Sequence, residues 1–190
     1  MKKMLEEQIH NNISAHLSLL KMNKTIEEVV KIITKKIKKG GKLMFCGNGG
    51  SAADSQHLAA EFLVRLRPNI NRKPIAAISL AQDTSTITAC GNDFDFDEIF
   101  LRPFKALSNK NDILICITTS GNSKNILKVL MEAKKQSILT IGFLGNDGGK
   151  AKKDCDFKLI VDSNNTARIQ ECHIFLGHFI LERIEDNLMK

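Results

Sequence analysis

The chain has 190 residues, of which 43% are hydrophobic and 26% charged, and its formal net charge is +7. These values fit one globular α/β domain; no apolar run approaches the roughly 20 residues of a membrane helix, and no apolar segment follows Lys2 and Lys3 as in a signal peptide. The chain has no Tyr or Trp, and its lysines are not interleaved with exposed aromatic residues, so a base-stacking platform is unsupported. We therefore predict a cytoplasmic protein with no nucleic-acid or membrane partner.

Two helices are predicted at the start of the chain, and we expect residues 1–39 to form an extension that packs on the domain, on another subunit, or on both. The second helix has Thr25 as a plausible N-cap and stops at Gly40-Gly41, so that the lysine-rich segment 35–42 forms its solvated last turn. The first helix spans residues 3–21 and carries a narrow apolar seam: Leu5, Ile9, Ile13, Leu17 and Leu20.

Beyond residue 41, apolar runs typical of buried strands alternate with helical patterns. The strands are continuously apolar rather than alternating, as expected when helices cover both faces of a sheet. We therefore predict an α/β fold, in which residues 1–190 form one doubly wound domain with a mainly parallel sheet of about five strands. The predicted strands are 42–46, 74–80, 112–119, 137–145 and 156–162, and the helices are 51–64, 97–107 (with a break at Pro103), 122–136 and 167–188.

Two strand ends carry similar loops, GNGGS at 47–51 and SGNS at 120–123, and each leads into a helix. Glycine lets the backbone approach an anion, and the free N–H groups of a helix start favour negative charge. Ligands of open α/β sheets bind beyond the carboxyl ends of the strands. Ordinary tight turns with N-caps would explain each loop alone, but the two together suit a phosphorylated sugar.

His57 and Glu61 are four residues apart on the helix after GNGGS and share a face, where Glu61 has apolar neighbours and suits a general base. A surface His–Glu pair is the alternative. His178 lies in the apolar run IFLGHFIL, and such a histidine taken alone is more often a satisfied core residue. Gln170, eight residues earlier on the same helix, also needs a polar partner and raises the alternative of a polar site. Five scattered cysteines without a CxxC pair indicate free, buried thiols.

The motifs GNGGS, GNDF, TSGNS, DGGK and RIQE followed by HIFLGH resemble the sedoheptulose 7-phosphate isomerases, or phosphoheptose isomerases, of the sugar isomerase (SIS) domain group. The similarity runs in order over nearly the whole chain. It implies conversion of sedoheptulose 7-phosphate to D-glycero-D-manno-heptose 7-phosphate, the first step toward the heptose of bacterial lipopolysaccharide or related surface glycans, in a homotetramer.

The resemblance also implies roles for individual residues. Glu61 and His178 match the catalytic pair, and His57, Glu61, Gln170 and His178 match positions that hold zinc in some members; no nicotinamide or flavin is needed. One departure is Ala167, where relatives often have Asp before RIQE. The residues matching substrate contacts are Asn48, Gly49, Gly50, Ser51, Glu61, Asn92, Asp93, Thr118, Thr119, Ser120, Ser123 and Gln170.

Three other functions compete with this interpretation. The first is a non-catalytic SIS protein that binds the replication initiator; such proteins tend to lack the glutamate and the second histidine, which this chain keeps. The second is an isomerase of a shorter phosphosugar, since loop composition cannot count substrate carbons. The third is a metallohydrolase, which the absence of an HExxH motif disfavours.

Gln170 and His178 raise a geometric question. On an unbroken helix their Cα atoms lie roughly 12 Å apart and differ by about 80° in direction, too far for one zinc ion. Either the helix breaks between them, or two chains share the site. The segment has one glycine, Gly177, and no proline, so a sharp break is not favoured. We therefore predict a composite site at a subunit interface, with His57 and Glu61 joined by Gln170 and His178 drawn from different protomers.

Overall fold

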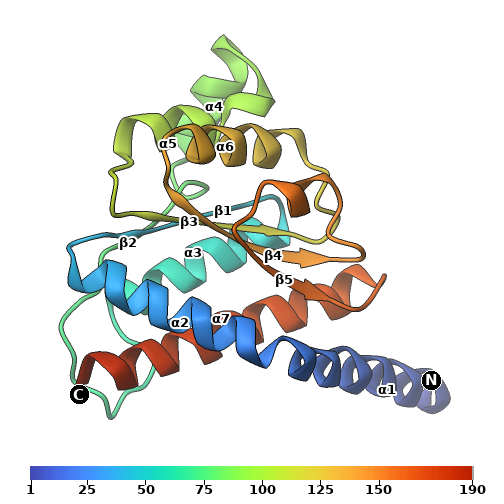
Figure 1. Ribbon diagram of the computed structural model, residues 1–190. Coiled ribbons are helices and arrows are strands. Elements are labelled where there is room, and N and C mark those ends of the chain that lie inside the picture. The colour runs from blue at the N-terminus through green and yellow to red at the C-terminus, as the bar shows by residue number, and fades with distance from the viewer. Residues whose placement is uncertain (190) are drawn as a thin grey trace.

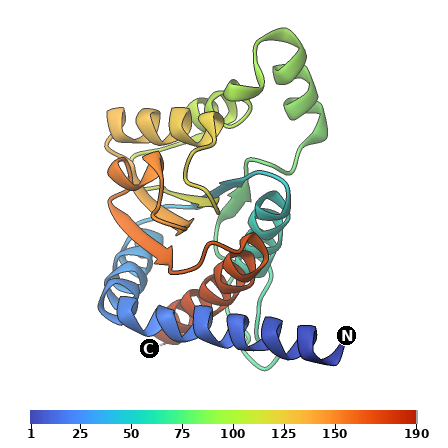
Figure 2. The ribbon, with the colours of Figure 1, turned by 90° about the vertical axis from the view of Figure 1, so that its right-hand side faces the viewer.

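The computed structural model describes residues 1–189. A five-stranded sheet lies between two layers of helices (Figures 1 and 2). Its neighbouring strands are all parallel, in the order β2-β1-β3-β4-β5, which confirms the predicted doubly wound sheet. The strands are Leu43–Gly47 (β1), Ala77–Ser79 (β2), Ile113–Thr118 (β3), Leu139–Gly145 (β4) and Phe157–Val161 (β5).

Helices α1, α2, α3 and α7 lie on one side of the sheet and α5 and α6 on the other, while α4 projects beyond α5 and α6 (Figure 1). None of the helices within residues 1–189 combines the length and apolarity needed to cross a bilayer. The α-helices are Lys2–Ser18 (α1), Asn23–Lys38 (α2), Gly50–Leu63 (α3), Thr84–Asp93 (α4), Leu101–Leu107 (α5), Lys124–Lys135 (α6) and Thr166–Met189 (α7). Short 3-10 turns occupy Leu19–Met22, Phe96–Glu98 and Lys150–Lys153.

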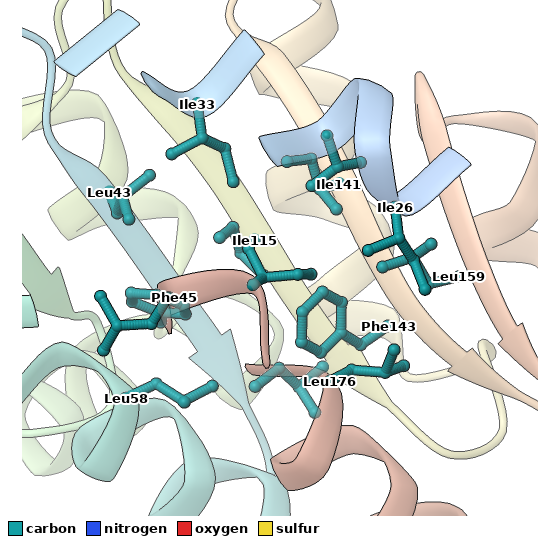
Figure 3. Close-up of a cluster of buried hydrophobic side chains, with 14 of the residues drawn as sticks. Ile26, Ile33, Leu43, Phe45, Leu58, Ile115, Ile141, Phe143, Leu159 and Leu176 are labelled. Atoms are coloured by element: carbon teal, nitrogen blue, oxygen red, sulfur yellow. The ribbon is translucent and has the colours of Figure 1, made fainter. Parts of the chain in front are cut away.

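The core has two halves because successive strand residues point to opposite faces of the sheet. Met44, Cys46 and Leu114 face α5 and α6, whereas Phe45 and Ile115 face α2, α3 and α7. Both faces are thus buried, as the continuously apolar strands predicted. Figure 3 shows the second half, in which Ile26, Ile33, Leu58 and Leu176 of the helices pack on Leu43, Phe45, Ile115, Ile141, Phe143 and Leu159 of the sheet.

The two N-terminal helices differ in how far they pack against the rest of the domain. α2 packs on the sheet, and Gly40 ends it with a φ of +78°, in the left-handed region that favours glycine. The prediction of Thr25 as its N-cap was wrong, because the helix already begins at Asn23. α1 extends away from the body (Figures 1 and 2), and its five seam residues are 48–72% exposed.

Two predictions around α4 and α5 were wrong. We did not predict α4, since its sequence TSTITACGND is rich in β-branched and small residues with modest helix propensity. The Asp83 carboxylate starts it as an N-cap, accepting hydrogen bonds from the backbone of Ser85 and Thr86. Pro103 does not break α5: it lies in the first turn, where proline is tolerated, and the interruption lies upstream at 99–100.

All five cysteines are buried and free, as predicted. Burial raises the pKa of the Cys155 thiol to about 12 and that of Cys172 to about 11. Such thiols remain protonated at neutral pH and are poor nucleophiles.

Candidate functional site

The GNGGS loop joins β1 to α3 at the carboxyl edge of the sheet. Gly49 has a φ of +57°, which permits the abrupt turn from strand to helix. The backbone N–H groups of Ser51 and Ala52 bond to the carbonyls of Asn48 and Gly49, which fixes the first turn of α3. The helix start therefore faces the region beyond the strand ends, as predicted.

The TSGNS loop joins β3 to α6 at the same edge. The Thr118 hydroxyl oxygen accepts a hydrogen bond from the Gly121 N–H at 3.2 Å, and Ser120 Oγ accepts one from the Asn122 N–H at the same distance. Ser123 occupies the N-cap position of α6, yet its hydroxyl makes no capping bond. That hydroxyl is thus available to a ligand at the helix start.

A direct bond between two side chains links these loops. The Asn48 Nδ2 group donates to Asn125 Oδ1 at 2.9 Å, and Asn125 Nδ2 donates back to Asn48 Oδ1 at 2.9 Å. β1 and β3 are neighbours at the point where the strand order reverses, which is where open α/β sheets bind ligands. The two predicted cradles consequently form one continuous surface.

The loop after β4 braces the TSGNS loop, a role that sequence reasoning did not assign. The Ala151 N–H donates to the Gly121 carbonyl at 2.9 Å, and the Lys150 N–H donates to Asn122 Oδ1 at 3.1 Å. Gly121 has a φ of +64°, and a Cβ there would collide with the Gly148 carbonyl. The DGGK motif is the signal that could have indicated this contact, because its glycines permit the close approach.

His57, Glu61 and His178 come together in one chain. His57 Nε2 lies 2.8 Å from His178 Nε2, so one ring donates a hydrogen bond to the other, and it lies 3.7 Å from Glu61 Oε1. Burial, with a smaller effect of His57, lowers the pKa of His178, and Glu61 and Glu182 oppose this shift. His178 is thus not the isolated core histidine of the alternative reading.

One chain brings His178 to His57 and Glu61, so these three residues need no second protomer. α7 continues unbroken from Thr166 to Met189 and lies beside α3. Gly177 is the point of closest approach, since a Cβ there would lie 2.5 Å from the Leu58 side chain. This contact brings His178, which follows Gly177, next to His57, which precedes Leu58.

Gln170 lies at another level of the same helix pair. A Cβ on Gly50 would lie 2.5 Å from Gln170 Nε2, so this amide covers the start of α3. His57 and His178 meet about two turns further along both helices. Within one chain only His57, Glu61 and His178 converge, and Gln170 does not reach them. That Gln170 joins them from another protomer stays a prediction.

Comparison with known proteins identifies the family. The family model described as "SIS domain" matches residues 10–145. A phosphoheptose isomerase of Clostridium acetobutylicum is 47% identical over 191 aligned positions, which cover 99% of this chain and 96% of the relative. One from Helicobacter pylori is 43% identical over 96% of both chains. The chain belongs to the phosphoheptose isomerase family.

Solved structures agree with this assignment to the phosphoheptose isomerases. The structure of the enzyme from Neisseria gonorrhoeae matches with a TM-score of 0.90 at 34% identity, covering 97% of this chain and 98% of that one. The enzyme from Francisella tularensis matches with a TM-score of 0.92 at 34% identity and covers 97% of both chains. The similarity thus includes α1 and α7 as well as the sheet.

Asn92 and Asp93, which match a third substrate contact in the family, are not joined to the two loops. Both are exposed at the end of α4, and Asn92 Nδ2 donates to Asp93 Oδ1 at 2.8 Å. Within residues 1–189 no hydrogen bond connects either side chain to GNGGS or TSGNS. Their role in substrate binding stays a prediction.

The donor set at the histidine pair suits zinc in its chemistry. Two imidazole nitrogens and a carboxylate are the ligands of many catalytic zinc sites. The 2.8 Å between the two Nε2 atoms is a hydrogen-bond separation, and no group of three His, Cys, Asp or Glu side chains in the described part of the chain has metal-binding geometry. To bind a zinc ion, His57 and His178 would thus have to move apart. They would lose the hydrogen bond between them, and each would bind the metal instead.

Asp54 is a polar residue beside this cluster that sequence reasoning missed. Its Oδ2 atom is buried and has no hydrogen-bond partner. Burial raises the pKa of its carboxyl, and the nearby His57 opposes that shift. The spacing of Asp54, His57 and Glu61 along one helix face was the signal that could have identified it.

Proposed function

We propose that this protein is an aldose–ketose isomerase that converts sedoheptulose 7-phosphate into D-glycero-D-manno-heptose 7-phosphate. The observation that carries the proposal is the same-chain cluster of His57, Glu61 and His178 on helices whose starts lie at the linked polar loops. The relatives called phosphoheptose isomerases support the substrate class. We place the reaction in the cytoplasm, as the first step toward the heptose of a bacterial surface glycan.

The reaction requires proton transfers on both carbon and oxygen. Glu61 removes a proton from C1 of the ketose and returns it to C2 of the enediol, which is the work of a general base. His178 donates to O2 and accepts from O1. Its lowered pKa keeps the imidazole neutral near pH 7, so that it can do both. His57 holds His178 in orientation through their hydrogen bond.

Substrate binding falls to the two loops. Thr118, Thr119, Ser120 and Ser123 would hold the phosphate at the start of α6, where helix N–H groups favour an anion. Asn48, Gly49, Gly50 and Ser51 would contact the sugar hydroxyls, with Gln170 above them. The net charge of +7 suits an anionic substrate.

We include zinc in the proposal because two imidazoles and a carboxylate lie together at this site. His57, Glu61 and His178 would hold the ion, with Gln170 as the family's fourth position. A bound zinc ion would supply Lewis-acid polarisation of a substrate oxygen, but it would occupy the same side-chain donor atoms that proton transfer by Glu61 and His178 uses. No nicotinamide or flavin is needed, because the isomerisation transfers no electrons to an acceptor.

Assembly into a homotetramer is the part of the proposal that concerns α1. The exposed seam on this helix lies beside an apolar groove of about 370 Å³, lined by Ile13, Leu17 and Leu20 of the N-terminal segment and by Phe175 and Phe179 of α7. Exposed apolar surface of this kind marks a protein contact. We further propose that residues 1–190 act as one SIS domain.

Turnover of phosphosugars of different length tests the function directly. We expect sedoheptulose 7-phosphate to be isomerised faster than pentose and hexose phosphates. A preference for a shorter sugar would support the second interpretation, and a complete lack of turnover would favour a non-catalytic SIS protein. The presence of Glu61 and His178 in contact distance of His57 favours an enzyme.

A further inference from the structure

The last turn of α3 leaves backbone carbonyls without partners inside the helix. α3 ends at Leu63, and the Val64 N–H bonds to the Ala60 carbonyl. The carbonyls of Glu61 and Phe62 therefore need donors from elsewhere, since the final carbonyls of any helix have none within it. One of these two carbonyls belongs to the proposed base itself.

The Arg72 guanidinium supplies those donors. Its Nη2 donates to the Glu61 carbonyl at 2.7 Å, and its Nη1 donates to the Phe62 carbonyl at 2.9 Å. The Ile75 N–H adds a second bond to Phe62 at 3.0 Å. The Arg72 side chain is only 2% exposed, so water does not compete for these carbonyls.

Glu185 of α7 holds Arg72 in place. Arg72 Nε donates to Glu185 Oε1 at 2.7 Å, and Arg67 Nε donates to Glu185 Oε2 at 2.8 Å. The Glu185 side chain is fully buried, and its charge is balanced by the two guanidinium groups. Because Glu185 follows His178 by seven residues on α7, this network joins the helix of the base to the helix of the histidine.

We propose that Arg72 is a positioning residue for the isomerase reaction. It fixes the main chain of Glu61 relative to α7, and thereby sets the placement of the Glu61 carboxylate against His57 and His178. The inference rests on the proposed function. The GNGGS loop lies at the other end of α3, about 20 Å away along a helix of 14 residues, so Arg72 should affect the chemical step rather than binding at that loop.

Arg72→Lys is the variant that tests this role, with Arg67→Lys as its matched control. Lysine keeps the charge beside Glu185 but cannot reach two carbonyls and a carboxylate at once. Arg67 belongs to the same network and contacts Glu185, Asp186 and the Glu182 carbonyl, but not Glu61. We expect Arg72→Lys to lower kcat by about 10- to 100-fold with KM unchanged, and Arg67→Lys to keep the wild-type kcat even where its Tm falls.

A double variant separates positioning from general destabilisation. Adding Arg72→Lys to Glu61→Gln should leave the residual turnover unchanged, because the group that Arg72 positions is already gone. Amide hydrogen exchange should be faster in residues 58–64 of Arg72→Lys than in those of Arg67→Lys. Arg72→Gln, which loses the charge but keeps one donor group, is a second variant to be assessed by the same measurements.

Three results would overturn the proposal: wild-type kcat in Arg72→Lys, an equal loss of kcat in Arg67→Lys, or the same factor of loss with and without Glu61. Faster exchange with unchanged turnover would leave Arg72 as a helix cap alone. If the wild-type protein turned over no phosphosugar, the proposed function would be wrong, and this inference would fail with it. The turnover assay with phosphosugars of different length reveals that outcome before any variant is made.

Discussion

Individual residues of the cluster owe their chemistry to their surroundings. His178 is half-buried against His57, and its lowered pKa favours the neutral imidazole that proton transfer between oxygens requires. Glu61 lies within reach of the same histidine, with its side chain 21% exposed. The proposed roles of Glu61 as base and His178 as proton carrier thus rest on residue type and position together.

Replacing Glu61 with glutamine tests the base. Glutamine keeps size and hydrogen bonding but cannot accept a proton, so we expect kcat to fall on the order of 100-fold or more with little change in unfolding free energy. The measurement is steady-state turnover, with Glu28→Gln on the exposed face of α2 as control. Near wild-type turnover in folded, zinc-free Glu61→Gln would remove Glu61 from this role.

The phosphate loop is tested by the double change of Ser120 and Ser123 to alanine. Each lost hydrogen bond to a charged group is worth roughly 1.5–3 kcal/mol, so phosphosugar binding should weaken mainly through KM. Competition by inorganic phosphate measures the same site without the sugar. Unchanged affinities for both phosphate and substrate would place the phosphate elsewhere.

His173 predicts how stability depends on pH. This residue is fully buried, its Nε2 lies 3.1 Å from the Leu144 carbonyl, and burial lowers its pKa to about 4. The unfolded chain, with a pKa of about 6.5, binds the proton more readily. Stability should therefore fall as pH drops from about 6.5 to about 4, by about 3 kcal/mol.

Urea unfolding at several pH values between 7 and 4 measures this effect. His173→Gln should show a shallower loss of stability with falling pH than the wild type, whatever its stability at pH 7. The exposed His10, changed to glutamine, is the control and should keep the wild-type slope. Equal slopes in all three proteins would show that His173 does not control acid stability.

At the scale of elements, the α3–α7 pair builds the cluster, and α1 carries the exposed apolar seam that we propose for assembly. Gly177 lets α7 approach Leu58 of α3, so a glycine that could have broken the helix instead sets the distance between two helices. α1 buries Ala15 but exposes its seam along most of its length. A helix with an uncovered apolar seam is typical of a contact between subunits.

Changing Leu5 and Ile9 to glutamate tests that contact without disturbing the core, because both are exposed in the single chain. We expect a smaller oligomer by light scattering, since two charges would be buried in the contact. Asn11→Glu with Ser14→Glu adds the same charge off the seam and should leave the assembly intact. A seam variant of unchanged size would contradict this role of α1.

For the whole molecule, the decisive feature is that one chain supplies His57, Glu61 and His178. Mixing inactive Glu61→Gln with inactive His178→Ala, through dissociation and reassembly, should therefore restore no activity, because every site keeps one defect. Mixed oligomers are verified by mass spectrometry, and a mixture with wild-type protein serves as the positive control. Recovered turnover in the mixture of variants would show that two chains share the site.

Three features could be predicted from the sequence: the parallel sheet, the two polar loops, and the placement of His57 and Glu61 on one helix face. These depend on local signals: continuously apolar strands, glycines at strand ends and the 3.6-residue period of a helix. The helix α4 was not predicted, because its sequence has modest helix propensity and the stabilising cap by Asp83 was not recognised.

The three-dimensional contacts were needed to place His178 beside Glu61 within one chain, and to show that Arg72 caps the helix of the proposed base. Both depend on contacts between residues far apart in the sequence. Gln170 and His178 lie too far apart on α7 to bind one zinc ion, as their spacing predicted. Each lies beside a different part of α3: Gln170 lies beside Gly50, and His178 lies beside His57. A helical period fixes which side chains share a face, whereas the neighbour of that face is fixed by packing, here by the close approach of Gly177 to Leu58.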